Sequence, residues 1–104
     1  MAKMTVIYKT PKDIEFFERH YFEVHIPLAN QLPGLIKYEI NDGAIASITG
    51  NADVYRIANL YFESMEAMKK SFASEIGQQC AVDRIIFAPT NEDVQIYLYD
   101  SKDT

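Results

Sequence analysis

The segment VYRIANLYFES, residues 54–64, predicts a β-strand that leads directly into a helix. β-Branched and aromatic residues suit a pleated strand, and Ser64 is a good N-terminal cap for the helix that follows. Side chains alternate between the two faces of a strand, so this one separates into two sets. The aliphatic and aromatic set is Ala58, Leu60 and Phe62, and the tyrosine-rich set is Tyr55, Ile57, Asn59 and Tyr61. Neither set is polar enough for a solvated surface, so both faces of the strand need a cover.

The segments on either side predict the remaining elements. A first strand is expected at residues 4–9 and is followed by the helix start TPKD, in which Thr10 can cap, Pro11 fits the first helical position and Asp13 favours the first turn. Pro27 cannot donate to the backbone, so the helix should kink there. The other predicted elements are strands at 35–41 and 94–100 and a helical region after Ser64 that is capped again at Ser74.

The order β-α-β-β-α-β predicts an α+β, ferredoxin-like fold, with a four-stranded antiparallel sheet, helices on one face and a single domain over 1–104. The first helix should turn an apolar stripe toward the sheet, made of Ile14, Phe17, Tyr21, Val24 and Leu28. In the last strand the set expected to face the helices is Val94, Ile96 and Leu98.

The tyrosine-rich face of this sheet would remain bare in a single copy. Two copies packing sheet to sheet would cover it, which predicts a homodimer. The residues expected at the contact are Tyr55, Ile57, Asn59, Tyr61, Tyr97 and Tyr99.

The composition of the chain argues against several kinds of binding partner and indicates a cellular compartment. The 104 residues carry a net charge of -5 and no cluster of basic residues, which argues against nucleic-acid binding. Cys80 is the single cysteine, so no intramolecular disulfide can form; we expect a reducing compartment and a buried structural thiol. No apolar run is long enough for a signal peptide or membrane span, so a cytoplasmic protein without a membrane partner is expected.

Both histidines, His20 and His25, lie in the first helix. Residues five apart on an α-helix diverge by about 140°, so the pair predicts no metal site. His25 can reach the space between helix and sheet, or it can bond the backbone carbonyl that Pro27 leaves free. His20 is expected to be a bystander at the rim, and Glu15 and Glu18 are expected to be solvated.

Two longer stretches carry a family resemblance. The segment HYFEVHIPLANQLPGLIKYEI, with H-x-P-L at 25–28, L-P-G-L at 32–35 and then Tyr38, is followed by YRIANLYFESMEAMKKSFAS. Together they resemble the EthD-like branch of the dimeric α+β barrel superfamily. The resemblance implies two sheets joined into a barrel across a dimer, and a small-molecule pocket between helices and sheet in each subunit.

The resemblance also implies candidate site residues. In methylmuconolactone isomerase, a member of the superfamily, the pocket holds a helix histidine and a tyrosine of the next strand, which correspond to His25 and Tyr38. That enzyme's pocket cysteines have no counterpart here, so its own lactone isomerisation is not implied. The residues expected to bind a ligand are Tyr8, Val6, Leu60 and Phe62; the alternative for Tyr8 and Tyr38 is an ordinary core tyrosine.

Histidine beside tyrosine predicts acid–base chemistry without a cofactor. A neutral imidazole can take a proton and a phenol can donate one, which suits enolisation, lactone-type rearrangement or cyclisation of a hydrophobic carbonyl compound. One alternative is a binding or accessory protein with the same pocket and no turnover. Another is haem degradation, but the haem-degrading relatives place a histidine on the second helix and commonly use tryptophan, and this chain has neither.

Overall fold

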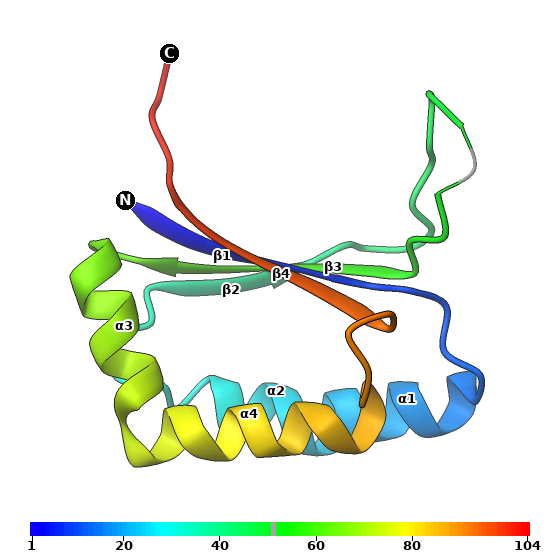
Figure 1. Cartoon of the computed structure of the whole chain (residues 1–104), viewed down its shortest axis with the longest axis horizontal. Helices are drawn as coiled ribbons and strands as arrows, with labels where there is room; N and C mark the ends of the chain where they lie inside the picture. Colours follow the sequence, from blue (N-terminus) through cyan, green and yellow to red (C-terminus); the bar gives the residue numbers. More distant parts are fainter. Residues whose placement is uncertain (51) are drawn as a thin grey trace.

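The computed structural model describes residues 1–50 and 52–104 and has two layers, an antiparallel sheet and a set of helices on one of its faces (Figure 1). The sheet order is β2-β3-β1-β4. The strands are β1 (Ala2–Tyr8), β2 (Lys37–Ile40), β3 (Arg56–Phe62) and β4 (Val94–Asp100). The helical segments are α1 (Ile14–His20), the π-helical turn η1 (Tyr21–His25), α2 (Ile26–Ala29), α3 (Met65–Ala73) and α4 (Glu75–Phe87). The predicted ferredoxin-like fold is confirmed.

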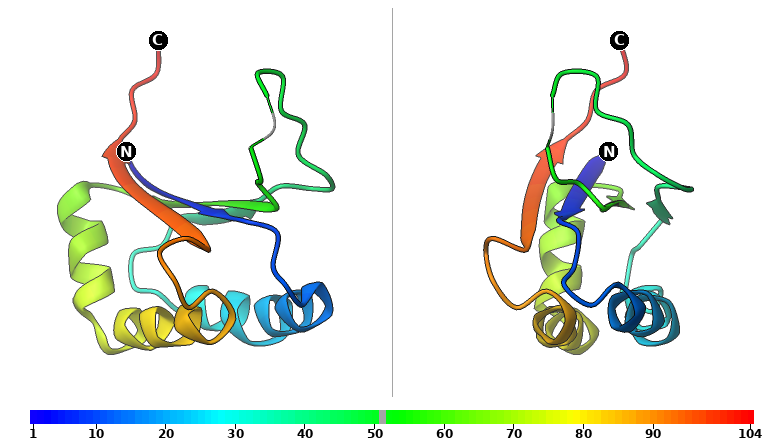
Figure 2. Two further views of the ribbon diagram at one scale, coloured as in Figure 1. Left: turned by 45° about the vertical axis from the view of Figure 1, so that its right-hand side comes forward. Right: turned by 90° about the vertical axis from the view of Figure 1, so that its right-hand side faces the viewer.

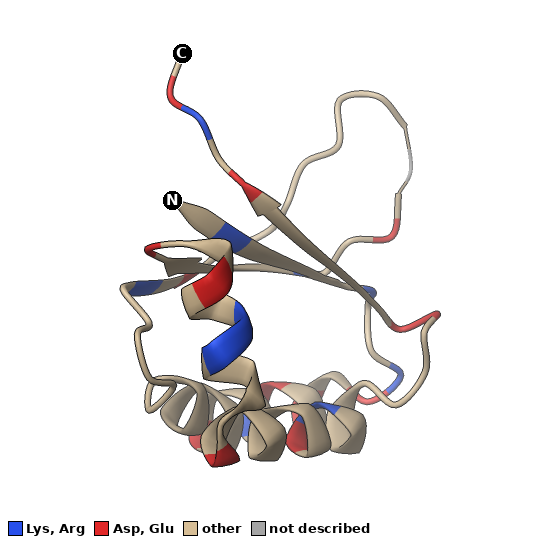
Figure 3. Cartoon of the chain, turned by 60° about the vertical axis from the view of Figure 1, so that its left-hand side comes forward, with Lys and Arg blue, Asp and Glu red and all other residues tan. Residues whose placement is uncertain are grey.

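The helix layer consists mainly of two rods that lie side by side beneath the sheet. One rod is the continuous run α1–η1–α2 and the other is α4, while α3 stands upright at one end of the sheet (Figure 2). Charged residues of both signs are dispersed over the helices and strand ends (Figure 3). In the part of the chain that the structure describes, no helix is both long and apolar enough to cross a membrane.

The first helix starts later than expected and follows a different stripe. Its N-terminal cap is Asp13, whose carboxylate accepts from the Phe16 N–H at 3.0 Å, while Thr10 bonds the side chain of Asp53 instead. Two members of the predicted stripe, Ile14 and Val24, are exposed at 47% and 44%. The buried side chains are instead four residues apart throughout, namely Phe17, Tyr21, His25 and Ala29.

The π-helical turn η1 explains this change of stripe. The Ile26 N–H donates to the Tyr21 carbonyl, five residues back, so the turn is wider than that of an α-helix. Residues four apart therefore stay on one face, and Val24 turns away from the sheet. Pro27 occupies the first turn of α2, where its missing N–H costs little, and the chain stays helical through it.

The strand β4 forms an edge of the sheet that the helices leave largely uncovered. Its first residue, Val94, is buried, but Ile96 and Leu98 are exposed at 43% and 45% although they share the helix side of the sheet with Val6 and Met4. All three therefore lie on the expected side of the sheet, but only Val94 is covered there. The helix layer is narrower than the sheet.

Tyr55 does not lie on the outer face of the sheet, contrary to the prediction. It precedes β3, its hydroxyl donates to Glu18 of α1, and its ring packs edge-on against Phe17 with centroids 5.6 Å apart. Glu18 is likewise not simply solvated, because it also accepts from Arg56 Nη2 at 2.7 Å. Strand alternation does not extend to Tyr55, because β3 begins at Arg56.

The rest of the predicted outer face has the expected orientation. Thr5 Oγ1 lies 2.7 Å from Asn59 Oδ1 and 3.0 Å from the Tyr99 hydroxyl, so β1, β3 and β4 share one polar cluster there. Tyr61 donates to Glu39 at 2.5 Å on the same side. This face mixes aromatic rings with hydrogen-bonded polar groups.

Candidate functional site

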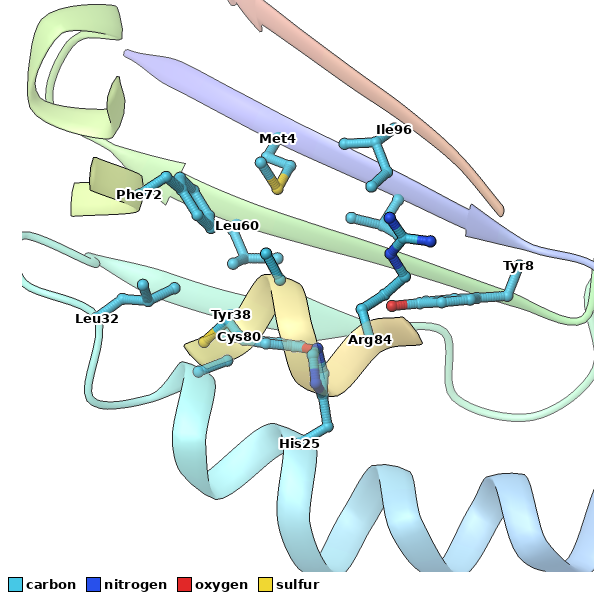
Figure 4. A pocket seen from close by; sticks show the side chains of 13 residues that line it. Met4, Tyr8, His25, Leu32, Tyr38, Leu60, Phe72, Cys80, Arg84 and Ile96 are labelled. Carbon is cyan, nitrogen blue, oxygen red and sulfur yellow. The ribbon is translucent and has the colours of Figure 1, made fainter. Parts of the chain in front are cut away.

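A cavity of about 140 Å³ lies between the sheet and the helix layer (Figure 4). Its walls come from β1, β2, β3, β4, the η1–α2 rod, α3 and α4. The lining residues are Met4, Val6, Tyr8, His25, Ala29, Leu32, Tyr38, Leu60, Phe72, Cys80, Ala81, Arg84 and Ile96. An apolar cavity of roughly 150 Å³ can hold a benzene molecule, so this one accommodates a single six-membered ring.

Five of the six site residues predicted from the sequence line this cavity: His25, Tyr38, Tyr8, Val6 and Leu60. The sixth, Phe62, does not. Its side chain is fully buried at the far end of β3 and packs against the Phe72 ring, with centroids 5.8 Å apart. Phe62 therefore supports the cavity wall from behind through Phe72.

His25 is held by a carboxylate of the second helix. Its Nδ1 lies 2.9 Å from Oδ2 of Asp83 on α4; the residue is only 8% exposed, and its ring packs between Tyr21 and Phe87. The backbone carbonyl near Pro27 is not its partner. Among the described residues none bonds Nε2, the other ring nitrogen, and His25 is one of the residues that line the cavity.

His20 binds the same carboxylate and is not a bystander. Its Nε2 lies 2.8 Å from Oδ1 of Asp83, so the two histidines take one oxygen each. The divergence of about 140° applies to an α-helix, whereas the intervening η1 turn brings residues five apart onto one side. Over residues 1–50 and 52–104 no group of three His, Cys, Asp or Glu side chains is arranged to hold a metal ion.

The position of Asp83 in the sequence of the second helix could have indicated its role. Asp83 shares one side of its helix with Ile76, Cys80 and Phe87, and an acidic residue inside an apolar stripe needs a buried partner. In the structure Asp83 is 7% exposed and has two partners. Cys80, on the same side, is buried as predicted, and burial raises the pKa of its thiol to about 11.

Three tyrosines meet near the cavity. The hydroxyls of Tyr38 and Tyr21 lie 2.7 Å apart, and the Arg56 guanidinium sits over the Tyr21 ring at 4.7 Å. Burial raises the pKa of Tyr8, Tyr21 and Tyr38 well above the usual value for a phenol. These hydroxyls therefore stay protonated at neutral pH and can act as hydrogen-bond donors.

The environment of His25 favours the neutral imidazole. Burial lowers the pKa of His25 and outweighs the Asp83 carboxylate, which raises it; the neighbouring His20 and Arg84 lower it further. A neutral ring with Nδ1–H fixed on Asp83 has the lone pair of Nε2 available as a base.

The lowered pKa of His25 makes stability depend on pH. Between its folded pKa and 6.5, its ordinary value, the unfolded chain binds more protons, so the free energy of unfolding should fall as pH is lowered. Urea unfolding at pH 7.5 and 5.5 should show a loss from this residue of up to about 1.4 kcal/mol. His25→Gln keeps a donor for Asp83 without titrating and should show a smaller difference. Equal differences in the two proteins would contradict the assignment.

The geometry defines a class of protein: a ferredoxin-like α+β domain with a small cavity between helices and sheet. The model of the EthD domain family matches residues 9–90. An uncharacterised 11.0 kDa protein of Rhodococcus erythropolis, from the thcB-thcC intergenic region, is 37% identical over 89 residues, which cover 85% of this chain and 84% of that protein. The chain belongs to the EthD family.

Solved structures share the fold over nearly the whole chain. An ethyl tert-butyl ether d (ethd) family protein of Bacillus halodurans superimposes with a TM-score of 0.86 at 22% identity, covering 98% of this chain and 99% of that one. A dimeric ferredoxin-like protein of unknown function from Jannaschia sp. gives 0.71 at 10% identity, with coverage of 97% and 100%. SnoaB, a cofactor-independent oxygenase of Streptomyces nogalater, gives 0.68 at 12% identity, with coverage of 99% and 94%.

Proposed function

We propose that this protein binds a small cyclic or short-chain carbonyl compound in the cavity and moves a proton on it without a cofactor. The observation that carries the proposal is the state of His25: a neutral imidazole in the cavity wall, with Nδ1 fixed by Asp83 and Nε2 free. A positioned base with a lone pair toward the ligand is the central requirement for removing a proton from carbon.

His25 would act as the base and Tyr38 as the acid. Nε2 takes a proton from the carbon next to the carbonyl, the C–H electron pair moves into the new C–C double bond, and the carbonyl oxygen gains negative charge. Asp83 stabilises the imidazolium that forms, and the Tyr38 hydroxyl donates to the oxygen. Return of the proton to another atom of the ligand, or attack of the enolate within the ligand, completes an isomerisation or a cyclisation.

The hydrogen bond between Tyr21 and Tyr38 supports this role. When Tyr38 donates to a ligand oxygen, its own oxygen can accept from the Tyr21 hydroxyl 2.7 Å away, which polarises the donor further. SnoaB is described as a cofactor-independent oxygenase, so one protein of this fold performs chemistry without a cofactor. A binding protein without turnover would use the same cavity, and the histidine test separates the two.

His25→Gln is expected to lower kcat by about 10²-fold or more while changing the ligand Kd by less than about threefold, because general-base catalysis contributes this much. The assay follows deuterium exchange at the carbon next to the carbonyl of a bound cyclic ketone by NMR. The exposed variant Arg19→Gln is the control. Exchange at the wild-type rate in His25→Gln would overturn the catalytic role, and no exchange in the wild type would favour the binding protein.

We also propose that two copies pair through the outer face of the sheet. Tyr97 and Tyr99 of β4 are exposed at 51% and 41% in the single chain, and the Jannaschia protein of the same fold is described as dimeric. The contact between the two copies would include the polar cluster of Thr5, Asn59 and Tyr99.

Tyr97→Lys should raise the dimer dissociation constant by about tenfold or more, since it places two charges in an interface. Sedimentation velocity over a range of protein concentrations measures this. Ile85→Lys, at a position of similar exposure on the opposite side of the molecule, is the control and should leave the dimer intact. A monomeric wild type, or an equal effect of both variants, would contradict the proposed face.

A further inference from the structure

One end of the cavity holds two polar side chains that the proton transfer does not use. Tyr8 is near the end of β1 and Arg84 follows Asp83 on α4, and both line the cavity. In Figure 4 the Tyr8 hydroxyl points toward Arg84, while Leu32 and Phe72 lie at the other end. The cavity therefore has an apolar end and an end with a cation.

Arg84 has no carboxylate partner within the described residues. Its Nη1 donates to the carbonyl of Ala88 at 2.9 Å, and neither Nε nor Nη2 has a protein partner there. The adjacent carboxylate of Asp83 is directed to the two histidines instead. Four of the five guanidinium N–H groups are thus available, and Arg84 is the one cation among the lining residues.

Arg56 provides the contrast within the same fold. Arg56 is buried, whereas Arg84 is only partly buried; the Arg56 Nη2 is paired with Glu18 at 2.7 Å, and its guanidinium lies against the rings of Tyr21 and Phe22 at 4.7 and 5.0 Å. Arg56 is a structural cation, whereas Arg84 faces a cavity without such a counter-ion.

Tyr8 adds a second donor to this end. The residue is 2% exposed and its ring is fixed by Phe17, Tyr21 and Phe87, yet its hydroxyl has no hydrogen-bond partner among the described residues. Since its pKa is raised, the hydroxyl remains a donor at neutral pH. The Tyr8 hydroxyl is therefore a donor in the cavity wall that an acceptor of a ligand would engage.

We propose that Arg84 and Tyr8 bind a carboxylate of the ligand, so that the compound is a small cyclic or unsaturated keto acid rather than a neutral ketone. The inference rests on the proposed function, because it names the substrate class of the same cavity. A guanidinium matches the two oxygens of a carboxylate, and the phenol adds a third hydrogen bond. The cavity volume limits the apolar part to about one six-membered ring.

Paired probes test the proposal on the full chain at pH 7 and low salt. Benzoate and benzamide have the same ring and similar size but differ in charge, and calorimetry or ligand-observed NMR gives Kd for each. Benzoate should bind at least about tenfold more tightly than benzamide, as expected for charge-assisted hydrogen bonds. Arg84→Gln should abolish the preference and leave benzamide binding within about twofold.

Three further variants complete the test. Tyr8→Phe should weaken benzoate several-fold. Arg84→Lys keeps a charge and should retain part of the preference, which guards against a misfolded Arg84→Gln. Arg19→Gln makes the same change of net charge on the exposed surface and should leave the preference intact.

The failures are distinguishable. Equal binding of both probes, or an undiminished preference in Arg84→Gln, overturns the carboxylate inference and leaves the cavity and the His25 chemistry standing. Absence of binding by either probe overturns the small-molecule cavity itself, and the proposed function with it.

Discussion

Replacing Asp83 by alanine should lower the free energy of unfolding by about 3 kcal/mol, because two hydrogen bonds to a buried carboxylate are lost. The change leaves the Nδ1 of His25 and the Nε2 of His20 without the carboxylate oxygens at 2.9 and 2.8 Å. Both rings are largely shielded from water, with side-chain exposures of 10% and 15%, so solvent replaces the lost bonds poorly. Urea unfolding at pH 7.5 measures the loss.

Two other substitutions show whether the effect is specific to the bridge. Asp42→Ala removes an exposed carboxylate and should change stability by less than about 0.5 kcal/mol. Asp83→Asn keeps the shape and one acceptor, so it should cost less than alanine, yet it should still reduce proton transfer by His25 because the tautomer is no longer fixed. If Asp83→Ala destabilised no more than Asp42→Ala, the histidine bridge would not exist in solution.

Gly77→Ala is expected to be at least as damaging, with a loss of about 3 kcal/mol or more. A Cβ at this position would lie 2.5 Å from both the Phe72 Cα and the Ser71 carbonyl oxygen. These are backbone atoms of the last turn of α3, so no side-chain rotation relieves the contact. The junction between α3 and α4, on which the position of Cys80 and Arg84 depends, would have to open.

The matched control for this substitution is Gln79→Ala, two residues along the same helix and exposed. It should be neutral or slightly stabilising, because alanine is the best helix former. Thermal unfolding of both variants tests the difference. A Gly77→Ala protein with the wild-type melting temperature would show that the helices cross at a larger distance than in the structure.

Much of the fold can be predicted from local sequence patterns, such as helix caps and strand alternation, that the structure contains. The sequence predicts helix caps at Ser64 and Ser74, and their hydroxyl oxygens accept from the N–H groups of Ala67 at 3.0 Å and Gly77 at 3.2 Å. Alternation along β3 correctly placed Leu60 on the helix side. Local rules fail where two candidates compete, as in TPKD, where Asp13 caps the helix and Thr10 does not.

The same reasoning predicts some residues of the candidate site but not others. Helix geometry pointed to His25 and a family resemblance to both His25 and Tyr38, and both residues line the cavity. The partner of His25 could not be paired from sequence, because Asp83 is 58 residues away and the helix between the histidines is not α-helical throughout. Arg84 was missed because a lysine or arginine on a helix is ordinarily a solvated residue.

The turn η1 also affects how relatives of this chain should be aligned. A π-helical turn accommodates one more residue than an α-helix needs to cover the same face, so it behaves as a single-residue insertion within the rod. In a relative without the insertion, two histidines four apart would meet the same carboxylate. Alignments that allow no gap inside this helix would place one of the two out of register. The motif to search for is therefore a histidine pair four or five apart together with an acidic residue in the apolar stripe of the second helix.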